Sequence, residues 1–138
     1  MYATPHMAAG FSIILAFKDN LAIGIPLAIA SHFILDFVDE RGVPRKQAVY
    51  TDLLPALLCF IVSLFTGHFW LLFLGNICGN LFDLIDKKLY LAMFIPSKFK
   101  VTKYFHFQKQ IIFPSARFTK SIGWISALVI CSLLLFLK

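Results

Sequence analysis

Two side chains in the stretch SHFILDFVDE could bind a metal ion together. His32 and Asp36 are four residues apart, so a helix would place them on one face. Asp39 and Glu40 continue that face, but they follow the apolar part of the segment, and we expect water to solvate them. Imidazole nitrogen and carboxylate oxygen are ligands of zinc, manganese and iron. The spacing therefore predicts one wall of a metal site.

A second polar motif, GNICGNLFDLID, brings two carboxylates to the end of another apolar segment. Gly75, Gly79, Asp83 and Asp86 recur on one face at helical spacing. Glycines four residues apart let two helices approach closely in lipid. The motif therefore predicts a close helix contact, with both carboxylates directed toward the interior of a helix bundle.

The two motifs and an N-terminal histidine are expected at one depth. His6 opens the first apolar segment, Asp36 closes the second and Asp83 closes the fourth. If successive helices alternate in direction, these three ends lie on the same side of a membrane, with His32 about one turn deeper. Ionisable groups in a bilayer are costly and usually functional. We therefore predict a site for a divalent metal ion, zinc or manganese, with the ligands His6, His32, Asp36 and Asp83.

Two further residues are candidate catalytic groups. Asp86 is expected to act as a fifth ligand or to orient one, and His106, in the loop after the fourth segment, lies on the same side. A metal ion with an open coordination position activates water or polarises a phosphoryl or carbonyl oxygen. Helix capping or contact with water would explain any one of these polar residues alone. Their convergence at one level favours a site.

Apolar helices must position these residues. Of the 138 residues, 59% are hydrophobic and 14% are charged, and a soluble domain of this length could not bury so much apolar surface. We expect an all-α fold, a polytopic membrane helix bundle forming one domain over 1–138, with a basic interfacial segment, 87–120, before the last helix. The three cysteines lie in apolar runs without metal-binding spacing and are expected to be buried. Five hydrophobic segments, each near or below the roughly 20 residues that cross a bilayer, cover about 2–17, 21–38, 53–66, 68–85 and 121–137.

Basic residues gather on one side of the predicted membrane. With alternating helices, the N-terminus, 39–52 and 87–120 share a side that carries all thirteen Lys and Arg residues except Lys18 and Lys138. The positive-inside rule predicts a multi-pass protein of the cytoplasmic (inner) membrane with a cytoplasmic N-terminus. A re-entrant fourth segment would break this alternation. Lipid explains the positive charge, so membrane lipid is an expected partner and nucleic acid is not.

Three motifs in order, ATPHMAAG, SHFILD and GNLFDLID, resemble those of the small prokaryotic membrane-bound metal-dependent hydrolases. That family has an ATH-x-x-x-G opening, an SH-x-x-LD helix end and a later G-x-x-x-PD segment. The resemblance covers most of the chain. It implies a polytopic membrane protein whose metal site is built from His6, His32, Asp36 and Asp83.

The sequence departs from the family pattern at three places. Pro5 precedes His6 where the family has threonine, and Phe82 stands where proline precedes the aspartate. The histidine-rich segment after the last motif is reduced to His106 and its neighbours. If those histidines complete the site, the resemblance implies weaker metal binding or lost activity.

Three functions follow from these observations. The leading hypothesis is a membrane-embedded metal-dependent hydrolase acting at the cytoplasmic face on a lipid-linked or membrane-proximal ester, with the basic aromatic stretch 98–109 docking anionic headgroups. GNICGNLFDLID is also similar to the glycine-asparagine-aspartate segment of lipoprotein signal peptidases, which implies an intramembrane aspartic hydrolase using Asp36 and Asp83. The second motif of that family is absent. The third hypothesis is a non-catalytic membrane protein, an assembly subunit or a small transporter, whose buried acids pair with basic groups or carry protons.

Overall fold

The computed structural model describes residues 3–37, 47, 49–86 and 115–137. No strand occurs in these ranges, which confirms the predicted all-α fold. Most of the predicted basic segment, 87–114, lies outside them. The elements are α1 (Ala3–Ala16), α2 (Leu21–Leu35), a π-helical turn η1 (Val49–Leu53), α4 (Leu54–Thr66), α5 (Phe69–Asp86) and α6 (Ala116–Phe136).

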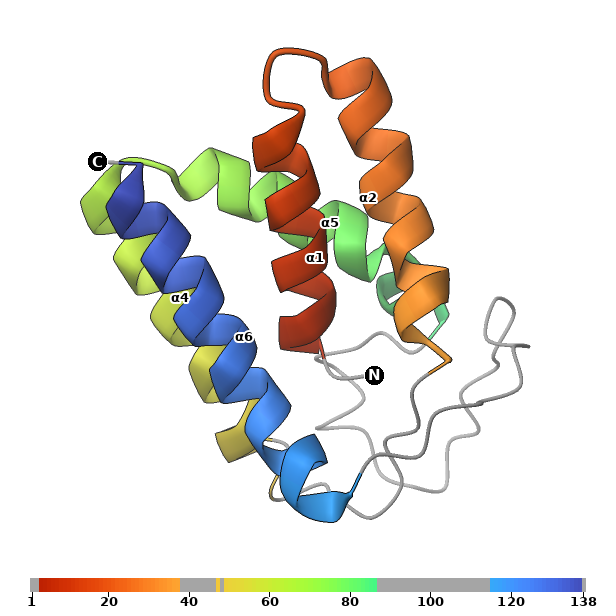
Figure 1. The fold of residues 1–138 in the computed structure, drawn as a ribbon, viewed down its shortest axis with the longest axis vertical. Coiled ribbons are helices and arrows are strands. Elements are labelled where there is room, and N and C mark those ends of the chain that lie inside the picture. Colours follow the sequence, from red (N-terminus) through yellow and green to blue (C-terminus); the bar gives the residue numbers. More distant parts are fainter. Residues whose placement is uncertain (1–2, 38–46, 48, 87–114, 138) are drawn as a thin grey trace.

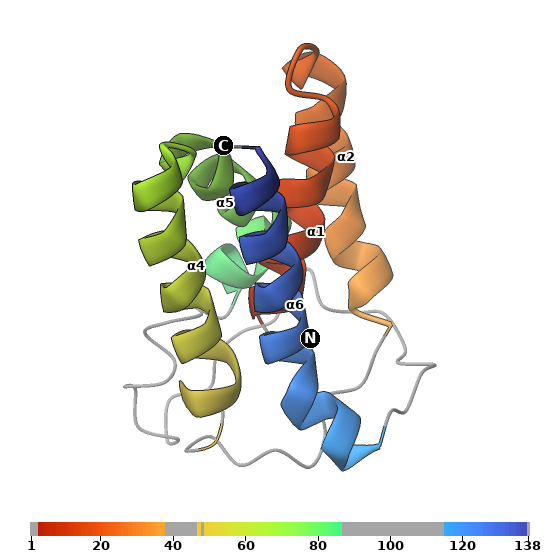
Figure 2. The same ribbon diagram turned by 60° about the vertical axis from the view of Figure 1, so that its left-hand side comes forward.

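The helices form two pairs, and α5 crosses between them. α1 and α2 are an antiparallel hairpin, while α4 and α6 lie side by side and run in the same direction as α1 (Figures 1 and 2). α4 ends at Gly67, whose left-handed φ of 76° favours glycine, and α5 then returns obliquely past α1 and α2 (Figure 1). Successive helices therefore alternate in direction. The start of α1 and the ends of α2 and α5 lie toward the same end of the bundle (Figure 1).

Two helices in the described part of the chain are long and apolar enough to cross a membrane. They are Val49–Thr66, with 18 residues, and Arg117–Phe136, with 20. The other apolar helices are shorter, at Ala3–Ala16, Leu21–Leu35 and Phe69–Leu84. Each predicted hydrophobic segment thus contains a helix, while length and composition support two membrane crossings.

Two helical segments begin earlier than predicted. α6 begins at Ala116 rather than Ser121, because the Ser115 side chain accepts a hydrogen bond from the Phe118 amide at 3.2 Å and caps the helix. The third segment gains the turn η1 ahead of Leu54. In both cases polar residues occupy the first helical turn, so the apolar pattern began too late to mark it.

Glycines allow α1 and α5 to cross in close contact. A Cβ atom at Gly10 would overlap the Gly75 carbonyl oxygen, and one at Gly79 would overlap the His6 carbonyl oxygen. The helix contact predicted from the glycine spacing is therefore confirmed, and its partner is α1. The contact brings the backbone of α5 directly against the first two turns of α1.

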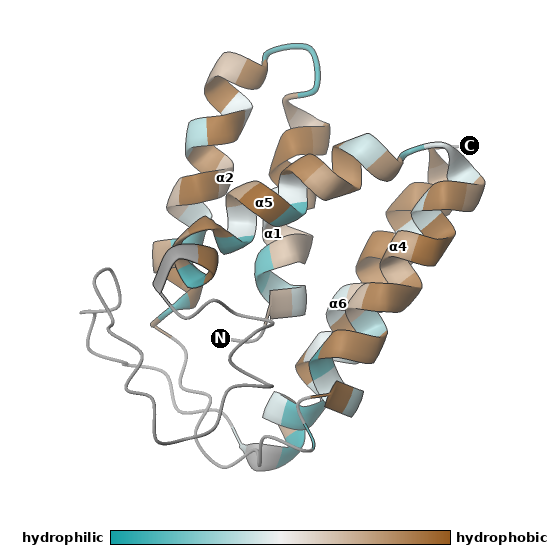
Figure 3. Cartoon of the chain, turned by 180° about the vertical axis from the view of Figure 1, so that it is seen from behind, coloured by the Kyte–Doolittle hydropathy of each residue, from teal (hydrophilic) through white to brown (hydrophobic). Residues whose placement is uncertain are grey.

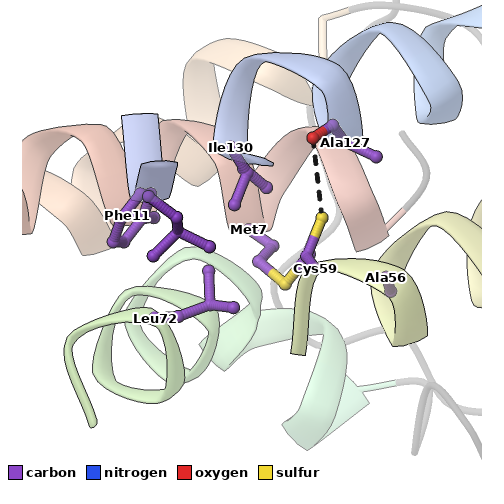
Figure 4. Close-up of a cluster of buried hydrophobic side chains, with 8 residues drawn as sticks. Met7, Phe11, Ala56, Cys59, Leu72, Ala127 and Ile130 are labelled. Carbon is purple, nitrogen blue, oxygen red and sulfur yellow. Dashed lines mark hydrogen bonds between the residues drawn. The ribbon is translucent and has the colours of Figure 1, made fainter. Parts of the chain in front are cut away.

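A hydrophobic core joins α1 to α4, α5 and α6. Met7 and Phe11 of α1 lie against Leu72 of α5, and the Cys59 thiol donates to the Ala127 carbonyl oxygen at 3.8 Å (Figure 4). Cys59 and Cys78 are buried and Cys131 is partly buried, all as free thiols, in agreement with the prediction for the cysteines. The fully buried core members are Met7, Phe11, Ala56, Cys59, Leu72, Ala127, Ile130 and Leu134.

Large apolar side chains also cover the outer faces of α4 and α6. Phe65 is 81% exposed and Leu128 is 67% exposed. Hydrophobic positions dominate both helices, whereas more polar positions gather at the turn between α1 and α2 and in the first turns of α6 (Figure 3). An outer surface of this kind is typical of helices that contact lipid.

Candidate metal centre

Two histidines and one aspartate meet inside the bundle. His6 lies in the first turns of α1, His32 in the last turn of α2, and Asp36 caps the C-terminus of α2. All three are buried, with exposed fractions of 0%, 1% and 7%. One potential ligand atom from each lies within 4.8 Å of the other two. Three of the four predicted metal ligands therefore converge.

The Asp36 carboxylate contacts both imidazole rings. Its Oδ1 atom lies 3.4 Å from His6 Nε2, and its Oδ2 atom lies 3.2 Å from His32 Nε2. The two rings are stacked, with centroids 4.3 Å apart and an angle of 28° between their planes. Both Nε2 atoms consequently face the same carboxylate.

The backbone of α5 orients His32. Its Nδ1 atom lies 3.0 Å from the Gly79 carbonyl oxygen. Because a carbonyl oxygen only accepts, Nδ1 carries the proton in this contact, and Nε2 of the neutral ring presents its lone pair toward Asp36. Histidine ligands of metal ions usually donate their second ring N–H in this way.

Aromatic rings enclose one side of the site. The ring centroid of Phe82 lies 5.5 Å from that of His32 and 4.6 Å from that of Phe33. Phe82 immediately precedes Asp83 on α5, and its ring lies beside the His32 ring.

A buried carboxylate that the sequence analysis did not identify holds the start of α1. Asp52 in η1 is 3% exposed. Its Oδ2 atom accepts a hydrogen bond from the Ala3 amide at 3.0 Å, and its Oδ1 atom accepts one from the Thr4 amide at 2.7 Å. An acid just before an apolar segment normally caps its own helix. No local pattern around Asp52 indicates that it caps a helix 48 residues away.

Asn80 of α5 holds the same turn of α1 from another side. Its Nδ2 atom donates to the Ala3 carbonyl oxygen at 3.2 Å and to Asn76 Oδ1 at 2.9 Å. The segment that carries His6 is therefore bound to both η1 and α5.

The remaining predicted site residues have different outcomes. Asp83 is fully buried on α5 and close enough to His6 for a Coulombic interaction, but it is not part of the group of three. Asp86 is the last residue of α5, and its side chain lies outside the part of the chain that the structure describes. His106 lies outside it as well.

The residues present fit a divalent metal ion. Ligand atoms bound to one tetrahedral zinc at ~2.0–2.1 Å are about 3.3 Å apart, close to the 3.4 Å and 3.2 Å separations of the imidazole nitrogens from the carboxylate oxygens. His6 Nδ1 is buried with no hydrogen-bond partner among the described residues, and His6 Nε2 lies 3.4 Å from Asp36 Oδ1, at the long end of hydrogen-bond range. Buried polar atoms are nearly always satisfied, so a cation at this position would complete the coordination of His6.

Comparisons with known proteins place no constraint on the function. No protein-family model, no curated protein and no solved structure was found to match this chain. The residues and the geometry of the site are therefore the basis for inferring the function.

Proposed function

We propose that this chain is a membrane-embedded metal-dependent hydrolase that acts at the cytoplasmic face of the cytoplasmic membrane on a lipid-linked or membrane-proximal ester. The observation that carries the proposal is the buried convergence of His6, His32 and Asp36. Two imidazoles and a carboxylate are a known ligand set of catalytic metal sites, in which three protein ligands leave a position open.

In this proposal the three converging residues bind zinc or manganese, and Asp83 is a fourth ligand or orients one. When bound, such an ion would act as a Lewis acid that polarises a phosphoryl or carbonyl oxygen of the substrate, and it would lower the pKa of a water molecule bound to it. The hydrogen bond from His32 Nδ1 to Gly79 fixes the ring and its tautomer. Asp86 and His106 are the groups proposed to accept or donate protons during hydrolysis.

The surface of the bundle supports a substrate that comes from the membrane. The helices α4 and α6 expose large apolar side chains along their length, and the site itself is buried beside aromatic rings. An ester attached to a lipid could reach such a site without leaving the bilayer. The basic stretch 98–109 would bind the anionic headgroup of that lipid.

Metal content and metal-dependent hydrolysis test the proposal. The detergent-purified chain is loaded with zinc or manganese, dialysed and assayed for bound metal, then tested on acyl and phosphate esters presented in mixed micelles. We expect about one ion per chain, and hydrolysis that a chelator abolishes and metal restores. Failure to bind either ion at saturating concentration would overturn the proposal.

Matched variants distinguish the site from nonspecific binding. His32→Ala and Asp36→Asn are expected to lose both metal and hydrolysis. His68→Ala removes a histidine between α4 and α5, and Asp19→Asn removes an exposed carboxylate at the turn between α1 and α2. Both controls are expected to keep the ion.

A proton-carrying cluster is the second candidate, because the same distances suit an ion pair. A protonated imidazole 3.2 Å or 3.4 Å from a carboxylate oxygen is a salt bridge, and buried ionisable groups in membranes often carry protons. Persistent absence of metal, together with proton uptake that Asp36→Asn abolishes, would favour this function.

Hydrolysis that resists chelators but is lost in Asp36→Asn would instead favour the intramembrane aspartic hydrolase.

A further inference from the structure

Asp52 forms an N-terminal cap for α1 from a distant part of the chain. The carboxylate accepts hydrogen bonds from two consecutive backbone amides, those of Ala3 and Thr4. The Thr4 hydroxyl lies 2.6 Å from Asp52 Oδ1 and 2.8 Å from the Asp52 carbonyl oxygen, so it donates to one of these oxygens at a time. The first amides of a helix have no partners within it. Asp52 therefore satisfies them and complements the positive end of the helix dipole.

The capped turn is the one that carries His6. Thr4 precedes His6 by two residues, and the ring of His6 reaches Asp36 at 3.4 Å. The His6 backbone also lies against Gly79, where no Cβ atom would fit. The turn thus contacts both the Asp52 carboxylate and the backbone of α5, and a shift of the turn would move His6 Nε2 relative to Asp36.

The position of Asp52 itself depends on α6. Asp52 lies in a π-helical turn, an uncommon conformation often found near functional sites. Gly123 of α6 packs against this turn, and a Cβ atom there would overlap the Thr51 carbonyl oxygen. Contacts from α6 to η1 and from η1 to α1 therefore connect the longest apolar helix to the candidate metal centre.

We propose that Asp52 is a positioning residue of the metal centre, which sets the place of His6 by binding the first turn of α1. Asp52 acts through its hydrogen bonds to Ala3 and Thr4 and not through direct contact with the metal ligands. The inference rests on the proposed metal site. It assigns a function to a buried carboxylate that would otherwise be only a helix cap.

The test compares metal affinity and coordination geometry with stability. Zinc affinity is measured by competition with a chromophoric chelator, and Co²⁺ is used as a spectroscopic probe of ligand geometry, in the full chain and its variants. Asp52→Ala is expected to bind zinc roughly 10- to 100-fold more weakly, as for other residues that orient metal ligands, and to alter the visible spectrum of bound Co²⁺. Asp52→Asn, which keeps one acceptor oxygen, is expected to fall between Asp52→Ala and the wild type.

Cys59→Ala is the matched control for stability. It alters a buried side chain of the core, whose thiol donates to the Ala127 carbonyl oxygen, and it leaves the hydrogen bonds between Asp52 and the first turn of α1 in place. We expect a lower thermal midpoint with unchanged zinc affinity and an unchanged Co²⁺ spectrum. Asp52→Ala with affinity and spectrum equal to those of the wild type would overturn the inference.

Thr4→Val provides a second test in case Asp52→Ala does not fold. It removes the hydroxyl donor and leaves the backbone amides of the first turn in place. A folded Thr4→Val protein is expected to show weaker zinc binding that Thr4→Ser restores, and unchanged binding would contradict the inference. If the wild-type chain binds neither zinc nor Co²⁺, the proposed function fails and this inference with it, whereas metal binding unaffected by these variants overturns the inference alone.

Discussion

His32 Nε2 lies 3.2 Å from Asp36 Oδ2, one helical turn further along the chain at the end of α2. The other oxygen of the same carboxylate lies 3.4 Å from Nε2 of His6, which belongs to α1. His6 of α1 thereby joins His32 and Asp36, which share one face at the end of α2. The resulting set of two nitrogens and two oxygens is buried and closely spaced.

Metal affinity is expected to weaken as the pH falls. His6 and His32 bind a cation only through a neutral nitrogen, and protonation competes with the metal. Zinc binding should therefore release protons wherever either imidazole is protonated in the metal-free protein. The check is the apparent dissociation constant of zinc between pH 5 and 8. Loss of zinc at the acidic end of this range is the expected result, and an affinity independent of pH would contradict the two-histidine site.

Gly79→Ala is expected to remove metal binding as well as to destabilise the fold. The added Cβ atom would overlap the His6 carbonyl oxygen, and overpacking of this kind typically costs about 1–3 kcal/mol. Separation of α1 from α5 would also disturb the hydrogen bond from His32 to Gly79. Thermal unfolding and zinc competition measure the two effects.

Gly67→Ala is the control for that substitution. Its φ of 76° disfavours alanine, yet no atom lies within 4 Å of the added Cβ. This variant should lose stability and keep zinc affinity. Equal affinities of Gly79→Ala and Gly67→Ala would show that the crossing of α1 and α5 does not position the site.

Asp83→Asn is expected to weaken zinc binding by ~10-fold or more. Asp83 is buried, and its negative charge acts on His6. The amide keeps the shape and removes the charge that favours a bound cation, whether Asp83 is a ligand or orients one. Zinc competition provides the measurement, with Asp19→Asn as the exposed control. Unchanged affinity would exclude Asp83 from the site.

The two tryptophans are expected to contact lipid hydrocarbon. Trp70 is 74% exposed at the start of α5, and Trp124 is 43% exposed on α6. Because the chain contains only these two, fluorescence reports on both without a label. In vesicles, brominated acyl chains should quench the emission strongly and acrylamide weakly, with Trp70→Phe and Trp124→Phe assigning each signal. Efficient quenching by acrylamide alone would contradict burial of these faces in a membrane.

Local patterns in the sequence were enough to predict the helices and part of the site. Apolar runs and turn residues located all five α-helices, and the four-residue spacings of His32 with Asp36 and of Gly75 with Gly79 each indicated a shared face. Both spacings work because they depend only on the period of the helix. The starts of α6 and of the third segment were misplaced, since polar first turns interrupt the apolar pattern.

The sequence by itself therefore determined helix identity, the glycine contact surface and the pairing of His32 with Asp36. His6 was also among the predicted ligands, on the assumption that the helices alternate in direction. Only the tertiary structure decided that His6 reaches the Asp36 carboxylate, that Asp83 lies outside the group of three, and that Asp52 caps α1. These relationships join residues far apart in the chain, such as Ala3 and Asp52, which are 49 positions apart. They depend on how closely α1 and α5 pack and on how η1 meets α6, and periodicity within one helix carries no information about either contact.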